Sequence, residues 1–132
     1  MPKYTHMLAE EEELWDKFLA THEKEYLFFE YDIHVGEGTP PPGEYPEKYK
    51  KMVSALSTKR IDAIGHTETE IHIFEIRPHA GLPSLGALLG YNSLYAKKFK
   101  PTKPVTLNIV TDSVSPDDEK LFAENKIKIF IV

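Results

Sequence analysis

The hydrophobic positions of this chain recur at helical spacing in several stretches, which are separated by runs of a different pattern. Trp15, Phe18 and Leu19 fall on one side of a helix, and glutamates precede them where the helix dipole favours acidic side chains. Pro83 stands where a proline can begin a helix, and Ser115 stands where a serine can cap one. These patterns predict helices over about 8–23, 45–56, 82–99 and 115–125.

Aromatic and β-branched residues dominate the stretches between these helices, which favours strands. The predicted strands cover 25–38, 59–66, 70–78, 105–111 and 126–132. The polar turn at 67–69 is short enough to join the second and third strands as a hairpin. Three consecutive prolines at 40–42 mark a loop, because proline donates no backbone hydrogen bond.

Composition narrows the class of protein. A chain of 132 residues with 41% hydrophobic content can build one core, so we expect a single domain over 1–132. We find no apolar run long enough to cross a bilayer and no secretory signal, which predicts a soluble, cytoplasmic protein without a membrane partner. Zero cysteines exclude disulfides and thiolate metal sites, leaving oxygen and imidazole ligands.

The charge of the chain is acidic overall but uneven. A formal net charge of −5 argues against a protein that coats nucleic acid by bulk charge. Basic residues nevertheless cluster, which allows a local basic patch, although solvated surface is the more ordinary interpretation of each cluster. These clusters are Lys48, Lys50 and Lys51, then Lys59 and Arg60, and then Lys97, Lys98, Lys100 and Lys103.

Acidic residues interrupt the apolar hairpin. If the chain turns at 68–69, Asp62 and Glu75 become cross-strand neighbours on one face, with Arg77 two residues further along. The opposite face would hold Ile61, Ala63, Phe74 and Ile76. Two carboxylates facing each other in a sheet destabilise it unless a cation compensates. Mg²⁺ is one candidate cation, since one or two carboxylates usually hold it together with waters and phosphate oxygens.

A structural ion-pair cluster is an equally favoured interpretation of the spacing alone. On the predicted register Arg60 and Arg77 face one another further along the hairpin, where they could neutralise Asp62 and Glu75. The spacing therefore leaves a metal site and an ion-pair cluster both open.

The order of elements and the motifs resemble one known family. "KRIDAIG", "IFEIRP" and "LGALLGYNSLY" are similar to the PD-(D/E)XK nuclease superfamily, and to small phage-type members in particular. The resemblance covers about 57–99 by motif and most of the chain by element order. It implies an α/β (α+β) restriction-endonuclease-like core: a mixed sheet of four to five strands flanked by helices. It matches Asp62 and Glu75 to the metal ligands and Arg77 to the motif lysine.

Two positions depart from the family pattern. Arg77 replaces a lysine and stays protonated, so it cannot act as a base, although it can position phosphate and offset charge. The helix after the hairpin keeps Tyr91 but has Ala87 where relatives often carry glutamine. Glu30 and Asp32 on the first strand are further candidates for an acidic ligand, and His79 is a candidate for a group near the scissile phosphate.

Two functions follow from the resemblance. The first is a Mg²⁺- or Mn²⁺-dependent endo- or exodeoxyribonuclease that binds DNA and uses Asp62, Glu75 and Arg77. The second is a catalytically degenerate member of the fold, acting as an assembly component, for example of a phage particle, with protein partners or further copies of itself. The first locates the protein in the cytoplasm of a cell, and the second in a host cell or a virion.

Overall fold

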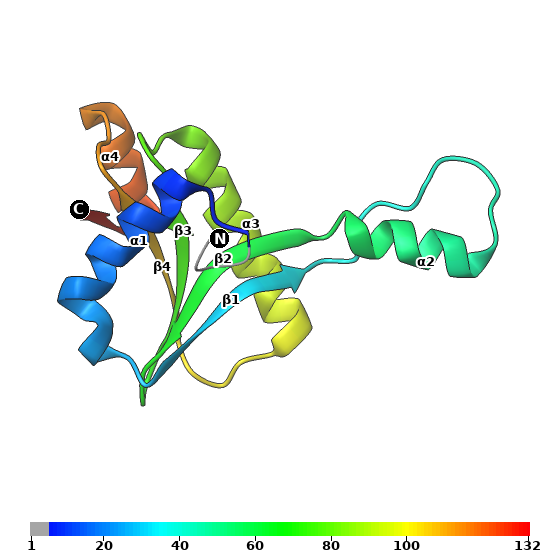
Figure 1. Cartoon of the computed structure of the whole chain (residues 1–132), viewed down its shortest axis with the longest axis horizontal. Coiled ribbons are helices and arrows are strands. Elements are labelled where there is room, and N and C mark those ends of the chain that lie inside the picture. Colours follow the sequence, from blue (N-terminus) through cyan, green and yellow to red (C-terminus); the bar gives the residue numbers. More distant parts are fainter. Residues whose placement is uncertain (1–5) are drawn as a thin grey trace.

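The computed structural model describes residues 6–132, with only the backbone of Ala55 and Leu56. The elements follow the predicted order closely, with boundaries that differ by a few residues at most ends (Figure 1). The helices are α1 (Ala9–His22), the short η1 (Glu23–Glu25), α2 (Glu47–Leu56), α3 (Leu82–Phe99) and α4 (Pro116–Glu124). The strands are β1 (Phe28–Val35), β2 (Lys59–His66), β3 (Ile71–Ile76), β4 (Val105–Thr111) and β5 (Ile127–Ile131).

The five strands form one mixed sheet in the order β1-β2-β3-β4-β5. β1 pairs with β2 and β2 with β3 in antiparallel orientation, whereas β3 pairs with β4 and β4 with β5 in parallel, with α3 and α4 as the crossovers. The predicted mixed sheet flanked by helices is therefore confirmed, with five strands.

The helix boundaries have local causes. Pro83 lies in the first turn of α3, where its missing N–H is not needed, and Lys100 ends the helix in a left-handed conformation. The Ser115 hydroxyl accepts a hydrogen bond of 3.3 Å from the backbone N–H of Asp118, so it caps α4 as the sequence predicts. Glu11 in α1 accepts a hydrogen bond from the backbone N–H of Leu8 at 3.2 Å.

Two buried clusters occupy the two faces of the sheet. Trp15 and Phe18 of α1 pack on one face against Phe74 and Val110, with ring centroids about 5 Å apart. Leu88 of α3 and residues of α4 pack in the cluster on the other face. A sheet that is covered on both sides explains why its strands are apolar almost throughout.

The backbone of β1 has a local kink at Asp32, where its pairing with β2 is interrupted. The φ of Asp32, 56°, is left-handed, and the ladder is interrupted at that position although Tyr31 still pairs with Ala63 and Ile33 with Ile61. Ala63 packs in the cluster under α1, but Ile61 packs in the cluster under α3. The prediction that Ile61 and Ala63 share a face is therefore wrong, because the kink interrupts the alternation of side chains.

Beyond this kink, β1 and β2 stay paired as far as Val35 and Lys59, and the arm between these two residues, 36–58, carries α2 away from the sheet (Figure 1). Among the described residues, the pairs of elements in close contact do not include α2. None of the helices in residues 6–132 is long and apolar enough to span a membrane.

Candidate functional site

Asp62 and Glu75 meet across the hairpin as the turn predicts. β2 and β3 pair Ala63 with Phe74, and the same register continued by one step brings Asp62 opposite Glu75. One carboxylate oxygen of Asp62, Oδ2, accepts a hydrogen bond of 2.9 Å from the backbone N–H of Ile76. The cross-strand register of the two acids is thus confirmed.

Glu75 is an acid inside the protein. Its exposed fraction is 8%, which is rare for a glutamate that has no paired cation. Burial raises the pKa of Glu75 from its usual 4.5 to about 8, and the negative charge of Asp62 and a hydrogen bond to it act in the same direction. Arg77 lowers this pKa, but by less than burial and Asp62 raise it. The pair therefore has a deficit of positive charge.

His6 and Asp32 join this pair from distant parts of the sequence. The Nε2 atom of His6 lies 3.3 Å from Oδ1 of Asp62, and its Nδ1 atom lies 3.6 Å from Oδ1 of Asp32. The hydrogen bond to Asp62 is the main cause that raises the pKa of His6. Oδ1 of Asp32 is buried without a hydrogen-bond partner among the described residues. Asp32 was among the predicted further acidic ligands, whereas no pattern in the sequence had indicated His6.

Glu11, Arg77 and Tyr91 surround the acids. Glu11 and Arg77, with Leu8, Glu10 and Pro78, line a surface pocket beside the end of β3. Burial raises the pKa of Glu11, and the charge of Asp62 adds to this rise. Burial likewise raises the pKa of the Tyr91 hydroxyl, and Glu75 and Asp62 contribute through their charges. The site thus draws on α1, the β2–β3 hairpin and α3.

The arginines do not form the predicted symmetric pair. The Nε atom of Arg60 lies 3.8 Å from Oδ1 of Asp32, so its carboxylate neighbour is on β1. Arg77 follows the end of β3, where its backbone N–H donates to the carbonyl of Val110 and its side chain is exposed. No ion pair within 4.0 Å joins either arginine to Asp62 or Glu75 in the described part of the chain.

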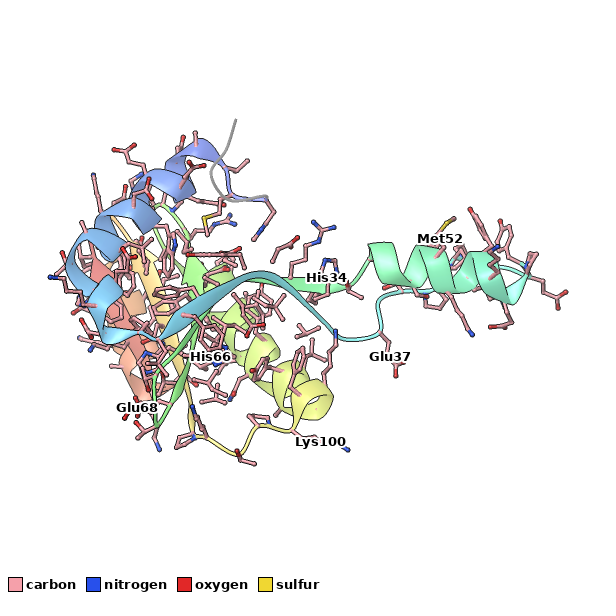
Figure 2. All side chains as sticks on the ribbon, turned by 60° about the horizontal axis from the view of Figure 1, so that its bottom comes forward. His34, Glu37, Met52, His66, Glu68 and Lys100 are labelled. Carbon is pink, nitrogen blue, oxygen red and sulfur yellow. The ribbon has the colours of Figure 1, made fainter. Side chains whose placement is uncertain are left out.

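Two accessory candidates have other partners. Glu30 of β1 has its Oε1 atom 2.6 Å from Nε2 of His66. His66 lies close to the turn of the hairpin (Figure 2). His79 is 80% exposed at its side chain and contacts Asp112 and Ser113 of the loop between β4 and α4. Its left-handed φ of 48° helps to turn it toward that loop.

The described residues contain no group of three histidine, aspartate or glutamate side chains close enough to bind one ion together. Two carboxylates are nevertheless a sufficient protein contribution for Mg²⁺, which takes its other ligands from water and phosphate. Asp62 and Glu75 supply the hard oxygen donors that this ion prefers, and Asp32 is linked to Asp62 through His6, which lies near both carboxylates. The residues therefore fit a magnesium ion.

One solved structure is similar to this fold, whereas neither the protein-family profiles nor the curated proteins gave a match. It is the crystal structure of a repair endonuclease from Pyrococcus abyssi, with a TM-score of 0.54 and 13% sequence identity. The similarity covers 97% of this chain and 49% of that one, so the chain spans about half the length of its neighbour. At this identity the likeness concerns the fold alone. The chain has a restriction-endonuclease-like fold, as its motifs and element order predict.

Proposed function

We propose that the protein is a Mg²⁺-dependent nuclease that hydrolyses DNA phosphodiesters at Asp62 and Glu75. The observation that carries this proposal is the burial of Glu75, 8% exposed, directly opposite a second carboxylate. Such a pair is unfavourable by itself, and a hard divalent cation would remove both the repulsion and the cost of burial. The nuclease-like fold adds support from an independent direction.

Asp62 and Glu75 would hold the metal ion. A bound Mg²⁺ supplies Lewis-acid polarisation of a phosphodiester oxygen and a more acidic water. The chain itself positions the carboxylates: the bond from Ile76 N–H orients Asp62, and the packing of β3 between two layers of helices immobilises Glu75. Such rigid placement is what a catalytic site requires.

Arg77 is the group of this site best suited to the phosphate. Its side chain is exposed and lines the pocket beside Glu11, so it can reach a substrate that Glu75 cannot contact from inside the sheet. A guanidinium ion stays charged at every working pH and can donate two parallel hydrogen bonds to a phosphate. Arg77 would therefore stabilise negative charge that develops during cleavage.

The test combines binding and cleavage. Calorimetric titration of Mn²⁺ into the pure protein should show one site that Asp62→Asn and Glu75→Gln each weaken, while the exposed turn variant Glu68→Gln leaves it intact. Fluorescent single- and double-stranded DNA should be cleaved in Mg²⁺ by the wild type and by Glu68→Gln only. Cleavage that persists in Glu75→Gln would remove this site from the reaction.

A second candidate is a nuclease-fold protein that has lost catalysis and serves in an assembly. The favouring observation is that both oxygens of Asp62 already have protein partners, namely Ile76 N–H and His6. In this case the carboxylate stabilises the end of the hairpin and the N-terminal segment. The wild type would then bind no Mn²⁺ at Asp62 and would cleave no DNA above the Glu75→Gln control.

A further inference from the structure

The arm formed by residues 36–58 is an ordered structure that makes little contact with the rest of the protein (Figure 1). The hydroxyl of Ser57 accepts a hydrogen bond of 2.6 Å from the backbone N–H of Thr39 and donates one of 3.2 Å to the carbonyl of the same residue. Gly38 has a left-handed φ of 77°, and a β-carbon there would lie 1.7 Å from the carbonyl oxygen of Ser54. The incoming loop is therefore packed tightly against the end of α2.

The helix in this arm is too short to be stable by propensity alone. α2 has 10 residues, whereas isolated helices need about 12 to 15 residues to be even marginally stable in water. The exposed large apolar side chains of the described arm are Tyr45, Tyr49 and Met52, and the rings of Tyr45 and Tyr49 lie 5.1 Å apart. An arm of this kind gains stability when a partner covers it.

The position of the arm relates it to the carboxylate site. β2 stops pairing with β3 beyond Ala63, next to Asp62, and β1 and β2 then continue as a two-stranded ribbon to Val35 and Lys59, where the arm begins. Lys59 is three residues from Asp62, or about 10 Å along a strand, and the 10 residues of α2 add about 15 Å. A duplex cleaved at Asp62 and running along the arm would therefore meet it about 3 to 7 base pairs from the scissile phosphate.

The charge of this region is opposite to that of the rest of the chain. The arm itself, residues 36–58, holds three lysines and three glutamates. With Lys59 and Arg60 of β2 at its root, residues 36–60 carry a net +2, so the remainder of the −5 chain carries −7. Such an uneven distribution concentrates attraction for a polyanion on one part of the molecule.

Lysines also line the surface where the arm meets α3. Two hollows share Gly36 and Glu37; one is lined by Lys97 and Lys98 of α3 and the other by Lys50 and Lys51 of α2. The Nζ atom of Lys98 donates to the carbonyl of His34 at 2.7 Å and so ties α3 to the root of the arm. Figure 2 shows His34 and Glu37 at this root and Met52 beyond it on α2.

We infer that the arm is a DNA-binding element that contacts the duplex flanking the cleavage site. The inference rests on the proposed function for its choice of partner. Lys48, Lys50 and Lys51 would neutralise backbone phosphates, and exposed Tyr45 and Tyr49 would pack against the sugars or against an unpaired base. Because phosphate contacts carry no sequence information, the arm would add affinity and orientation without a preference for sequence.

The test measures DNA binding by fluorescence anisotropy in EDTA, in full-length protein carrying Asp62→Asn so that cleavage cannot occur. The arm variant replaces Lys48, Lys50 and Lys51 by alanine, which favours the helix and so preserves α2. The matched control removes three exposed lysines away from the arm, namely Lys17, Lys24 and Lys120. A second arm variant, in which arginine replaces the same three lysines, keeps the positive charge.

On a duplex of about 20 base pairs, the alanine variant should reduce the slope of log affinity against log salt by about 2 to 3, because each lost phosphate contact removes about 0.9. The control and the arginine variant should keep the wild-type slope. Equal slopes for the arm variant and the control would overturn the inference. So would a fall in the sedimentation mass of the free arm variant with unchanged DNA affinity, which would identify the arm as a contact between copies.

This outcome is separable from that of the proposed function. If the protein binds DNA through the arm but wild type cleaves nothing in Mg²⁺, the nuclease proposal fails and the arm remains. If wild type cleaves DNA and the arm variant has the wild-type salt slope, the nuclease proposal stands and the DNA-binding role of the arm fails.

Discussion

The unusual protonation of Glu75 makes the stability of the metal-free protein depend on pH. A carboxyl whose pKa is higher in the folded state than in the unfolded chain binds its proton more tightly when folded. Its contribution to stability is therefore complete below pH 4.5 and is lost as the pH rises toward the folded pKa of about 8. The prediction is that metal-free wild type becomes less stable from pH 5 to pH 8, and that Glu75→Gln removes most of this loss.

The magnitude follows from the two pKa values. At about 1.4 kcal/mol per pKa unit, a rise from 4.5 to about 8 corresponds to about 5 kcal/mol once the pH exceeds 8, and to about 3 kcal/mol at pH 7. Small domains have total stabilities of about 5 to 15 kcal/mol, so this loss is large and easily measured.

The assay is urea denaturation at several pH values in EDTA, for wild type, Glu75→Gln and the exposed control Glu68→Gln. The quantity to compare is the difference in unfolding free energy between each variant and wild type. This difference isolates Glu75 from His6, whose raised pKa also lowers stability as the pH rises above 6.5. For Glu75→Gln the difference should increase by several kcal/mol from pH 5 to pH 8, and for Glu68→Gln it should stay constant. A constant difference for both would refute the argument that Glu75 is buried without compensation.

Added Mn²⁺ extends the same experiment. If Asp62 and Glu75 bind the ion, saturating Mn²⁺ at about 100 times its dissociation constant should stabilise the wild type by about 2.7 kcal/mol at constant pH. Glu75→Gln should respond much less. A wild-type transition that does not move in millimolar Mn²⁺ argues for the ion-pair interpretation of the acids.

Three further predictions concern single residues. Asp62→Asn should lower the pKa of Glu75 but leave it above 4.5, because burial raises this pKa more than the charge of Asp62 does. The pH dependence of the unfolding free energy measures this pKa, and a pH dependence with the same midpoint as in wild type would contradict the prediction. Arg77→Lys should keep or raise Mg²⁺-dependent DNA cleavage, whereas Arg77→Ala should reduce its rate by about 10²- to 10³-fold; equal rates for the two variants would exclude a role for Arg77 in charge stabilisation. Ser115→Ala should cost about 1 kcal/mol in urea denaturation through loss of the α4 cap, and Ser93→Ala, at an exposed position within α3, serves as its comparison.

Local signals were sufficient for most of the fold. The bounds of α3 and the cap of α4 depend on residues within one helical turn, and both were predicted correctly. The register of β2 and β3 was equally accessible, because the length of a hairpin turn determines which residues face each other. The opposition of Asp62 and Glu75 therefore needed no tertiary information.

Contacts between distant segments decided the rest. His6 reaches Asp62 across 56 positions of sequence, and Asp32 joins them through a left-handed residue that no strand pattern predicts. The partners of His79 lie more than 30 positions away, after β4 has brought Asp112 beside it. A short helix over 45–56 was predicted, but whether its apolar side chains would be buried depended on where β1 and β2 directed the arm. Periodicity specifies which side of an element is apolar, whereas only the packed chain specifies what that side contacts.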